Sequence, residues 1–438
     1  MDLVNIGILG LGTVGGGTAA VLSRNAEDIT RRTGKTIQVT MAADKDPSKI
    51  EEFSQLGIKV VDDALAIVQD PEIDIVVELI GGYTIAKELV LEAIKKGKHV
   101  VTANKALIAT SGNEIFAAAA EKNVTVAYEA SVAGGIPVIK AIREGLAANK
   151  ISSVAGIING TGNFILTEMR DKGSDFADVL KQAQELGYAE ADPTFDVEGI
   201  DAAHKLTILA SIAFGIPLQF DKVYTQGIST VQIDDVNYAE ELGYSIKHLG
   251  IAKKTETGIE LRVHPTLLSK KELLANVNGV MNAVLTLGDA VGPTMYYGAG
   301  AGSEPTASAV VADIIDIART INVTDTTSKV PALAFDINTL DSTDVKSIYN
   351  IDTAYYLRVS AMDRPGVMAD ITKVLGDHDI SIEAMIQKEA TNGDSNADII
   401  ILTTSTIESN MLDAISAIEE LDTISGEVVM LRVENPDK

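Results

Sequence analysis

The chain has 438 residues, a formal net charge of -26 and no cysteine. Its length predicts two or three domains, and its negative charge argues against a nucleic-acid partner, because phosphate binding requires clustered Lys and Arg. The missing cysteine excludes disulfides, thiolate metal sites and cysteine nucleophiles.

No apolar run reaches the ~20 residues that span a bilayer, so we expect no membrane segment. The first residues, MDLVNIGILGLG, have no basic region before their short apolar run. They predict a strand and not a signal peptide. The expected location is therefore cytoplasmic.

The first element is the apolar run from Leu3 to Leu9, which is consistent with a buried parallel strand. Gly10, Gly12 and Gly15 follow it and match G-x-G-x-x-G. Such glycines allow a tight turn and bring backbone N–H groups at a helix N-terminus close to a pyrophosphate. A glycine-rich turn can be purely structural, but its position at the first strand–helix junction favours dinucleotide binding.

The second strand, TIQVTMAAD, ends at Asp44, where a carboxylate usually hydrogen-bonds the adenosine ribose. Asp44 lies further from the glycines than the usual ~20 residues. The segment RNAEDITRRTGKT lengthens this connection. Lys45 follows at once and could meet a 2′-phosphate. Asp44 favours NAD and Lys45 permits NADP, so the sequence leaves the choice of cofactor open.

Strands and helices then alternate as far as the expected strand VTVAYEASV. This alternation predicts a doubly wound parallel sheet, the Rossmann type of α/β fold, over residues 1–131. Lys105 follows the strand HVVTA, and such sheets bind ligands at the carboxyl ends of their strands. We expect Lys105 to lie at that edge, although an ordinary surface lysine would fit the same pattern.

Residues 132–302 predict an α+β domain, and its most informative stretch runs from Gly187 to Lys205, GYAEADPTFDVEGIDAAHK. Asp201 and Lys205 are spaced i,i+4 and share one face of a helix. Most pairs of this kind are surface salt bridges worth only ~0.3–0.5 kcal/mol. Because the helix is very apolar, we expect instead a buried, paired lysine that can exchange a proton with a ligand.

The run YYGAGAGSEPTASAVVADIIDIAR predicts a glycine turn and an apolar helix at about 303–320, which we expect to complete the first domain. Residues 321–352 are polar and predict a linker. Residues 353–438 predict a strand–helix–strand–strand–helix–strand order, a ferredoxin-like module. We expect one face and the edges of its sheet to be available for pairing with a second copy.

Three stretches carry a family resemblance: A-x3-GYAEADPTFDVEGIDAAHK from Ala183, GKHVVTANK from Gly97 and NGTGNFIL from Asn159. Together they resemble the homoserine dehydrogenases, while DRPGVMADIT and the order of elements around it resemble an ACT domain. The resemblance covers essentially the whole chain. It implies NAD(P)-linked interconversion of L-homoserine and L-aspartate 4-semialdehyde, in the biosynthesis of threonine, methionine and isoleucine. It also implies a homo-oligomer, either a dimer or a dimer of dimers.

The resemblance assigns roles to individual residues. Lys205 is expected to protonate the aldehyde oxygen with help from Lys105, while Glu190, Asp201 and Asp196 bind or support the substrate. Cofactor contacts are expected from Gly10, Gly12, Thr13, Val14, Gly15, Asp44, Lys45, Gly81, Thr102, Lys105, Gly187 and Gly302. A monovalent cation site, sodium in that family, is expected at Glu129, Val132, Gly134 and Ile136. An effector, expected to be L-threonine, would contact Asp363, Arg364, Pro365, Gly366, Val367 and Met368.

Two other functions fit parts of the sequence. A different ACT-tailed dehydrogenase acting on a hydroxy acid would share both ends of the chain, but the stretch from Gly187 to Lys205 argues against it. A non-catalytic amino-acid sensor could keep the cofactor fold as a scaffold, but it would not need Lys205, Asp201, Glu190 and Lys105. The tail itself could serve only to stabilise an oligomer.

Overall fold

The computed structural model describes residues 2–323, 329–388 and 396–436. These residues form two compact units. Unit 1 comprises Met1–Gly160, Asp201–Val223 and Val280–Thr343, and unit 2 comprises Thr161–Ile200, Tyr224–Gly279 and Asp344–Lys438.

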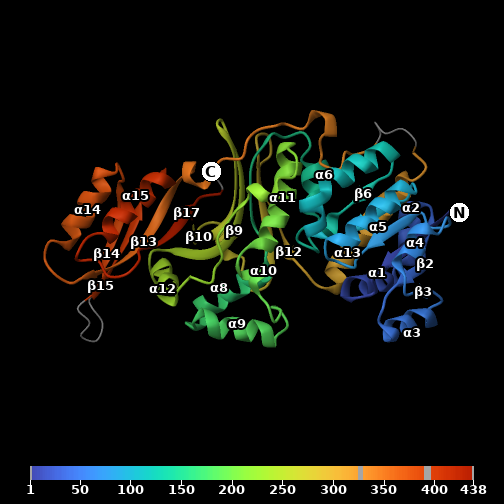
Figure 1. Cartoon of the computed structure of the whole chain (residues 1–438), viewed down its shortest axis with the longest axis horizontal. Helices are drawn as coiled ribbons and strands as arrows, with labels where there is room; N and C mark the ends of the chain where they lie inside the picture. Colours follow the sequence, from blue (N-terminus) through green and yellow to red (C-terminus); the bar gives the residue numbers. More distant parts are fainter. Residues whose placement is uncertain (1, 324–328, 389–395, 437–438) are drawn as a thin grey trace. The chain divides into compact units, whose positions relative to one another are not determined.

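Unit 1 contains a six-stranded parallel sheet in the order β3-β2-β1-β4-β5-β6 (Figure 1). The order reverses between β1 and β4, the position at which doubly wound sheets bind ligands. The strands are β1 (Leu3–Leu9), β2 (Thr36–Ala43), β3 (Lys59–Val61), β4 (Ile75–Glu78), β5 (His99–Thr102) and β6 (Val126–Ala127). The helices are α1 (Thr13–Arg24), α2 (Ala26–Thr33), α3 (Pro47–Gln55), α4 (Ala64–Gln69), α5 (Thr84–Lys95) and α6 (Lys105–Lys122).

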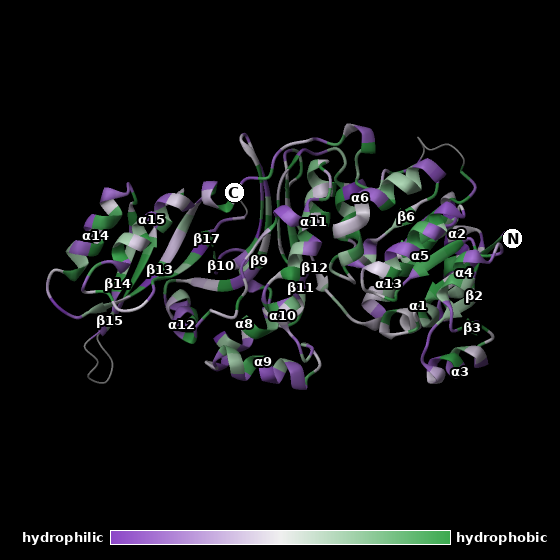
Figure 2. Cartoon of the chain, in the orientation of Figure 1, coloured by the Kyte–Doolittle hydropathy of each residue, from purple (hydrophilic) through white to green (hydrophobic). Residues whose placement is uncertain are grey.

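The helix α13 (Ser303–Thr320) packs into the core of this sheet. Its residues Ala307, Val310 and Ile314 are buried in the same hydrophobic cluster as Ile6 and Ile8. Figure 2 shows hydrophobic residues in the strands of this sheet and hydrophilic residues on the helices around it. Burial of aliphatic side chains, at about 25 cal/mol per Å², therefore holds this distant helix against the N-terminal sheet.

The remainder of unit 1 combines three antiparallel strands with a buried helix. The strands follow the order β12-β11-β7 and are β7 (Ile151–Ile157), β11 (Met281–Gly288) and β12 (Gly292–Ala299). The short helix α7 (Val138–Lys140) continues into a π turn, Ala141–Gly145. The helix α11 (Ile200–Phe214) is buried at every residue from Asp201 to Phe214. Any charge on α11 therefore requires a partner within the protein.

Unit 2 joins the rest of the central region to the C-terminal module. Its helices are α8 (Gly160–Lys172), α9 (Phe176–Glu185), α10 (Thr194–Val197), α12 (Ile233–Glu241), α14 (Val367–Asp377) and α15 (Glu408–Glu419). Its strands are β8 (Tyr224–Thr225), β9 (Tyr244–Thr255), β10 (Gly258–Ser269), β13 (Asp352–Met362), β14 (Ile382–Gln387), β15 (Asn396–Thr403), β16 (Thr406–Ile407) and β17 (Val429–Glu434). The C-terminal elements have the expected ferredoxin-like order.

The C-terminal sheet is continuous with the β9–β10 hairpin, because β17 pairs in parallel with β10 from Thr266↔Arg432 to Leu268↔Glu434. One face of the module contributes Tyr356 and Leu402 to a core shared with Val236 of α12. We expect a free face and free edges from the sequence. The structure shows that this is wrong for the face that packs against α12 and for the edge formed by β17, which pairs with β10. In the ladder that the structure describes, β14 forms the other edge.

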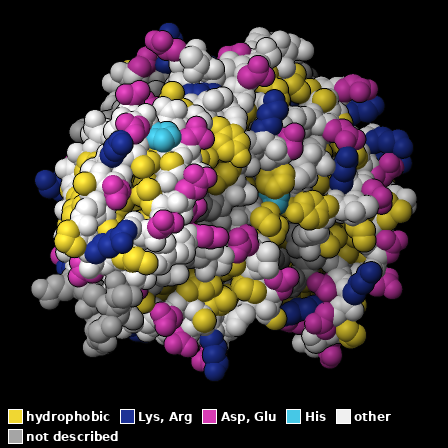
Figure 3. Space-filling view, turned by 60° about the vertical axis from the view of Figure 1, so that its left-hand side comes forward, with side chains coloured by type: hydrophobic (Ala, Val, Ile, Leu, Met, Phe, Trp, Pro, Cys, Tyr) yellow, Lys and Arg dark blue, Asp and Glu magenta, His cyan; other side chains and the backbone are white. Residues whose placement is uncertain are grey.

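Figure 3 shows Asp and Glu side chains spread over the face that it presents, as expected for a chain with a net charge of -26. Of the helices in the described ranges, none combines the length and the apolar character that crossing a membrane requires.

Candidate active site

The glycine-rich turn between β1 and α1 leaves little room for side chains. Gly10 has a φ of +94°, and a Cβ there would lie 2.9 Å from the Leu79 carbonyl oxygen. A Cβ at Gly15 would lie 1.9 Å from the Gly10 carbonyl oxygen. A Cβ at Gly12, in contrast, would meet nothing within 4 Å, so open space lies above the start of α1.

The N-terminus of α1 has the properties of an anion site. It has no side-chain cap and no acidic residue in its first turn. Gly12 and Thr13 are exposed, and Val14 is half-buried. Unpaired backbone N–H groups and the helix dipole favour a phosphate at such a position. The residues present therefore fit the pyrophosphate of a dinucleotide.

Asp44 follows β2 and supports this turn directly. Its Oδ2 accepts a hydrogen bond of 2.6 Å from the Leu11 N–H, and its Oδ1 accepts one of 2.9 Å from the Asp46 N–H. Lys45 is exposed beside it. Asp44 thus fixes the geometry of the glycine-rich turn, in addition to any bond that it makes to a ribose.

The adjacent strand ends are held together by a buried carboxylate, Glu78. Its Oε2 accepts a 2.6 Å hydrogen bond from the Thr102 hydroxyl, and its Oε1 accepts bonds from the N–H groups of Ile80 and Gly81. Gly81 is exposed with a φ of +77°. Because the Thr102 side chain is fully buried, its contribution to cofactor binding would be to position this edge of the sheet.

Lys105 occupies the first position of α6, directly after Asn104, whose Oδ1 caps the helix by accepting from the Leu107 N–H. The Lys105 Nζ lies 3.0 Å from the Asp201 Oδ1. Lys105 remains about one-third exposed, whereas Asp201 is 3% exposed. Lys105 therefore connects the cofactor-binding edge of the sheet to the buried helix α11.

Lys205 and Asp201 form the centre of the site. The Lys205 Nζ donates a 2.6 Å hydrogen bond to the Asp201 Oδ2 and a 2.7 Å bond to the Ile158 carbonyl oxygen. The Asn159 amide donates a 2.9 Å bond to the same Asp201 oxygen. The i,i+4 spacing thus gives a buried pair, not a surface salt bridge. Asn159 lies in the motif NGTGNFIL, but the sequence did not reveal its role because nothing in it specifies contact with Asp201.

This cluster carries an excess positive charge. Burial alone would raise the pKa of Asp201, but Lys205 and Lys105 outweigh it and hold that pKa well below its usual range. Burial lowers the pKa of the neighbouring His204 to about 4, so its imidazole is neutral near pH 7. One carboxylate therefore faces two lysine side chains, an arrangement suited to stabilising and protonating an oxyanion.

Glu190 and Asp196 belong to unit 2. Glu190 is exposed, and its carbonyl oxygen accepts a 3.1 Å hydrogen bond from the Gln184 amide. Asp196 is half-buried on α10. Gly187, after α9, has a φ of +74°. The structure thus brings Lys105, Asp201 and Lys205 together, while the substrate-binding roles of Glu190 and Asp196 stay predictions.

The segment expected to hold a cation is buried. Glu129 begins a 3-10 turn, Glu129–Ser131, and its carboxylate accepts hydrogen bonds from the N–H groups of Ile139 and Lys140. Burial and Asp313 raise the pKa of Glu129 to about 7. No group of three or more His, Asp or Glu side chains arranged to hold a metal occurs among the described residues. A cation here would therefore depend on backbone carbonyl oxygens.

The backbone from Val132 to Ile136 fits such a donor set. Ala133 and Gly134 have φ values of +52° and +32°, and Val132 and Ile136 are buried. Within the described ranges, the carbonyl oxygens of Val132 and Gly134 accept no backbone hydrogen bond outside regular elements. Carbonyl oxygens without donors are ligands that hard cations prefer.

The expected effector segment is a turn between β13 and α14. Asp363, Arg364, Pro365 and Gly366 are exposed, as is Met368, whereas Val367 is buried. Gly366 has a φ of +100° and forms an N-cap for α14 without a side-chain hydrogen bond. Backbone N–H groups at this helix start could therefore receive a carboxylate. Gly302, at the start of α13, also has a positive φ, of +125°, but its backbone is extended in ψ.

Family models match most of the chain. Residues 10–129 match the model "Homoserine dehydrogenase, NAD binding domain", residues 137–315 match "Homoserine dehydrogenase" and residues 355–423 match "ACT domain". The homoserine dehydrogenase of Pseudomonas aeruginosa is 61% identical over 434 residues, which are 99% of each chain.

Solved structures agree with this match. A homoserine dehydrogenase from Thiobacillus denitrificans has a TM-score of 0.94 and 61% identity, with 99% of each chain covered. A hyperthermophilic archaeal homoserine dehydrogenase in complex with NADPH has a TM-score of 0.61 and 28% identity, covering 72% of this chain and 97% of that one. The chain therefore belongs to the homoserine dehydrogenases, a family of NAD(P)-dependent oxidoreductases, and carries an ACT domain near its C-terminus.

Proposed function

We propose that the chain interconverts L-aspartate 4-semialdehyde and L-homoserine, with Lys205 as the group that exchanges a proton with the substrate oxygen. The observation that carries the proposal is the placement of Lys205 and Lys105 on the two oxygens of one buried carboxylate, Asp201. The family membership supplies the substrate pair. A nicotinamide cofactor, when bound, supplies or accepts the hydride.

The role of Lys205 follows from charge balance. Reduction of an aldehyde leaves negative charge on its oxygen, and a proton must reach that oxygen to give the alcohol. The Lys205 ammonium can deliver this proton, while Ile158 and Asp201 hold it in place. In oxidation, the neutral amine would take the proton back. Lys105 would stabilise the same oxygen by its charge.

Substrate recognition would use both the cluster and the acidic loop. Glu190, Asp196 and Asp201 are assigned to the substrate by the family resemblance, with a carboxylate suited to the ammonium group of an amino acid. The alternative of a dehydrogenase acting on another hydroxy acid is not supported, because the homoserine dehydrogenase family model matches the central region, residues 137–315. The non-catalytic sensor would not require the charge cluster.

The cofactor proposal includes both NAD and NADP. The Asp44 carboxylate already bonds to Leu11, and Lys45 is exposed next to it. A lysine in this position could pair with a 2′-phosphate without preventing NAD binding. The archaeal relative in complex with NADPH supports NADP as one of the two. Sodium, held by carbonyl oxygens around Glu129, Val132, Gly134 and Ile136, is part of the same proposal.

The C-terminal module would act as a sensor for L-threonine, with Asp363–Met368 as the binding segment. Its last strand supports the idea of regulation, because Arg432 of β17 is 1% exposed and reaches into the central region. Arg432 donates to Glu408 of the module and, at 2.8 Å, to the Oε1 of Gln226. The carbonyl oxygen of Gln226 lies 3.0 Å from the His248 Nε2.

The same contacts continue to the loop before α11. The His248 ring lies 3.1 Å from the position of a Cβ on Gly199, whose φ is +82°. Gly199 precedes Ile200, where α11 begins. A shift of β17 could therefore reach the loop that leads into the catalytic helix. Coupling of this kind is typically ~1–3 kcal/mol, or about 5–150-fold in affinity.

A homo-oligomer and a cytoplasmic location complete the proposal. The oligomer is supported by the family resemblance and by the sheet edge at β14. The other edge strand of the module, β17, is already paired within the chain. Light scattering at micromolar concentration should give at least twice the 46.2 kDa mass of one chain. A monomer mass would contradict it.

The activity is tested by mixing the purified chain with L-homoserine and either NAD or NADP and following nicotinamide absorbance. We expect reduction of the cofactor with L-homoserine and no reduction with simple 2-hydroxy acids. Absence of turnover with both cofactors would contradict the proposal.

A further inference from the structure

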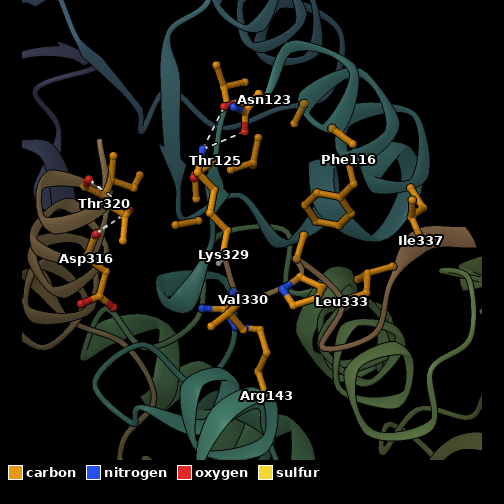
Figure 4. A pocket seen from close by; sticks show the side chains of 18 of the residues that line it. Phe116, Asn123, Thr125, Arg143, Asp316, Thr320, Lys329, Val330, Leu333 and Ile337 are labelled. Carbon is orange, nitrogen blue, oxygen red and sulfur yellow. Dashed lines mark hydrogen bonds between the residues drawn. The ribbon is translucent and has the colours of Figure 1, made fainter. Parts of the chain in front are cut away.

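A cavity of about 540 Å³ lies in unit 1, away from the groups assigned to catalysis. The C-terminal part of α6, β6, α13 and the segment 329–338 surround it (Figure 4). Neither the glycine-rich turn nor Lys105, Asp201 and Lys205 contribute to its lining. Its volume is within the range of ~300–1,000 Å³ that is typical of small-molecule sites.

One side of the cavity is apolar. Phe116 of α6 and the side chains of Leu333 and Ile337 lie together there (Figure 4). Phe116 and Leu333 are 4% and 3% exposed and Ile337 is 38% exposed, so this wall runs from the core to the surface. An alkyl chain of a few carbons would find a favourable surface here, at about 0.8 kcal/mol per buried CH₂ as a general scale.

The other side carries Arg143, a largely buried cation with a single hydrogen-bonded acid among the described residues. Its side chain is 12% exposed. Among the described residues, the only hydrogen-bond acceptor for it is the Glu144 Oε1 at 3.0 Å, and the Arg143 Nε is enclosed without a partner. Glu144 is itself 43% exposed, so solvent weakens the pair. Nearby charges support the Arg143 cation, but its five N–H donors are not all used in hydrogen bonds.

A second cation in the lining, Lys329, contacts neutral groups. Its Nζ donates 3.0 Å hydrogen bonds to the carbonyl oxygen and the Oδ1 of Asn123. Figure 4 shows this ammonium directed toward Asn123 and Thr125, while the Arg143 guanidinium lies beside Val330. The cavity therefore has a polar, positively charged side opposite its apolar wall.

Apart from Glu144, the acidic groups in the lining form no hydrogen bond to Arg143 among the described contacts, although burial, which would lower the Arg143 pKa, is outweighed by nearby groups that include the charge of Asp313. Asp316 pairs with Lys140 and with Arg319. Asp313 accepts a hydrogen bond from the Glu129 N–H. The Asp336 carboxylate accepts from the N–H and the amide of Asn338. These bonds leave the Arg143 guanidinium available to an incoming acceptor.

We propose that this cavity binds a small amphipathic monocarboxylate, with its carboxylate on Arg143 and its alkyl part against Phe116, Leu333 and Ile337. An arginine offers several N–H donors in one plane, which suits a carboxylate better than an alcohol or an amide. The site is distinct from the cofactor turn and from the ACT segment, and it does not depend on the proposed function.

The test measures binding of hexanoate to the full chain by ligand-observed NMR, with hexanol at the same concentration as the uncharged probe. We expect hexanoate to bind at millimolar concentration or below and hexanol to bind at least about tenfold more weakly, the scale of a charge-assisted hydrogen bond. Absence of hexanoate binding, or equal binding of the two probes, would overturn the proposal.

Three variants locate the binding. Arg143→Gln should weaken hexanoate about tenfold or more, whereas Arg319→Gln, which changes a more exposed arginine of the lining, should leave it unchanged. Ala120→Trp, at an exposed position of the lining on α6, should block the cavity without removing a charge. If circular dichroism shows that Arg143→Gln does not fold, the hexanoate affinity of Ala120→Trp tests the location of the site instead. Unchanged hexanoate binding in a folded Arg143→Gln or Ala120→Trp variant would contradict the assignment.

Discussion

The Lys105 Nζ lies 3.0 Å from the Asp201 Oδ1, although one residue begins a helix at the edge of the parallel sheet and the other lies in the buried helix α11. This contact joins the part of the chain that binds the cofactor to the part that carries Lys205. It makes Asp201 the common partner of two lysines. The chemistry that we propose depends on that shared carboxylate.

Asp201→Asn should therefore reduce turnover strongly. The variant keeps the shape of the side chain but removes the negative charge that pairs with both Lys205 and Lys105. We expect a loss of about 10²–10⁴-fold in kcat, the range for groups that support proton transfer. NADPH binding, measured by fluorescence titration, should change little because the glycine-rich turn is untouched.

The same substitution predicts a pH dependence of stability. The pKa of Asp201 is held below its usual value of 3.8 in the folded state. Its stabilising contribution is therefore fully present above about pH 4 and is lost as the pH falls through the lower, folded pKa. Urea unfolding of the wild type and Asp201→Asn should show a constant difference from pH 5 to pH 8. A difference that disappears within that window would show that Asp201 is not held ionised by its lysines.

Lys247 gives an opposite pH effect in unit 2. It is 1% exposed, and its Nζ donates to neutral acceptors, the Val277 carbonyl oxygen at 2.6 Å and the Asn278 Oδ1 at 3.0 Å. Burial lowers the pKa of Lys247 to about 7 from 10.5. The unfolded chain therefore binds more protons than the folded chain between those two values, so this group makes stability rise with pH.

Lys247→Met should remove that dependence. The stability of the wild type minus that of Lys247→Met should increase as the pH rises from about 7 to about 9. Lys254→Met, on the same strand β9 at an exposed position, is the matched control and should show no such slope. A flat difference for Lys247→Met would mean that this lysine stays protonated in the fold.

Lys45 should affect the choice between cofactors. If its ammonium meets a 2′-phosphate, Lys45→Ala should raise the KM for NADP about 10-fold to 100-fold and leave that for NAD nearly unchanged. Lys35→Ala, directly before the amino end of β2 and hence at the opposite end of the strand that leads to Lys45, should change neither. Equal losses for both cofactors would show that Lys45 does not discriminate between them.

Gln226→Met should weaken regulation without changing basal turnover. The variant removes the Oε1 that accepts from Arg432 but keeps the backbone carbonyl that faces His248. We expect the threonine concentration for half-inhibition to rise, or maximal inhibition to fall, by several-fold. Gln219→Met, which lies outside this set of contacts, is the control and should leave inhibition by threonine unchanged.

Point variants suit this question better than removal of the module. Deleting the chain after Ser342 would take β17 away from β10 and expose Arg262, whose Nη1 bonds to Glu434. A truncated chain could lose activity for that reason alone. If the full chain does not respond to millimolar threonine, the sensor assignment is wrong whatever the variants show.

The sequence was sufficient for the parts of the fold that local patterns determine. The apolar run Leu3–Leu9 and the glycines after it predicted β1 and the turn. The glycines are required there because close packing excludes a Cβ at Gly10 or Gly15. The i,i+4 spacing and the apolar neighbours gave the buried pair Asp201–Lys205. These features depend on residues near one another in the chain.

Other features depend on distant contacts and could not be predicted. The expected strand VTVAYEASV ends at Ala127, and Glu129–Ser131 form a 3-10 turn. The turn is fixed by the Glu129 carboxylate, which caps Ile139 and Lys140, and by Asp313, which accepts from the Glu129 N–H. The pairing of β17 with β10 likewise joins strands from two expected domains. No local pattern specifies such partners.

Lys205 is the residue that we propose to donate the proton to the aldehyde oxygen. This role is tested most directly by single-turnover reduction of L-aspartate 4-semialdehyde by Lys205→Ala with bound NADPH, beside Lys87→Ala, which removes a lysine from a more exposed ion pair with Glu114. We expect a loss of about 10²–10⁴-fold for Lys205→Ala, with unchanged NADPH affinity and a normal rate for Lys87→Ala. A rate for Lys205→Ala within a few-fold of the wild type would contradict the claim.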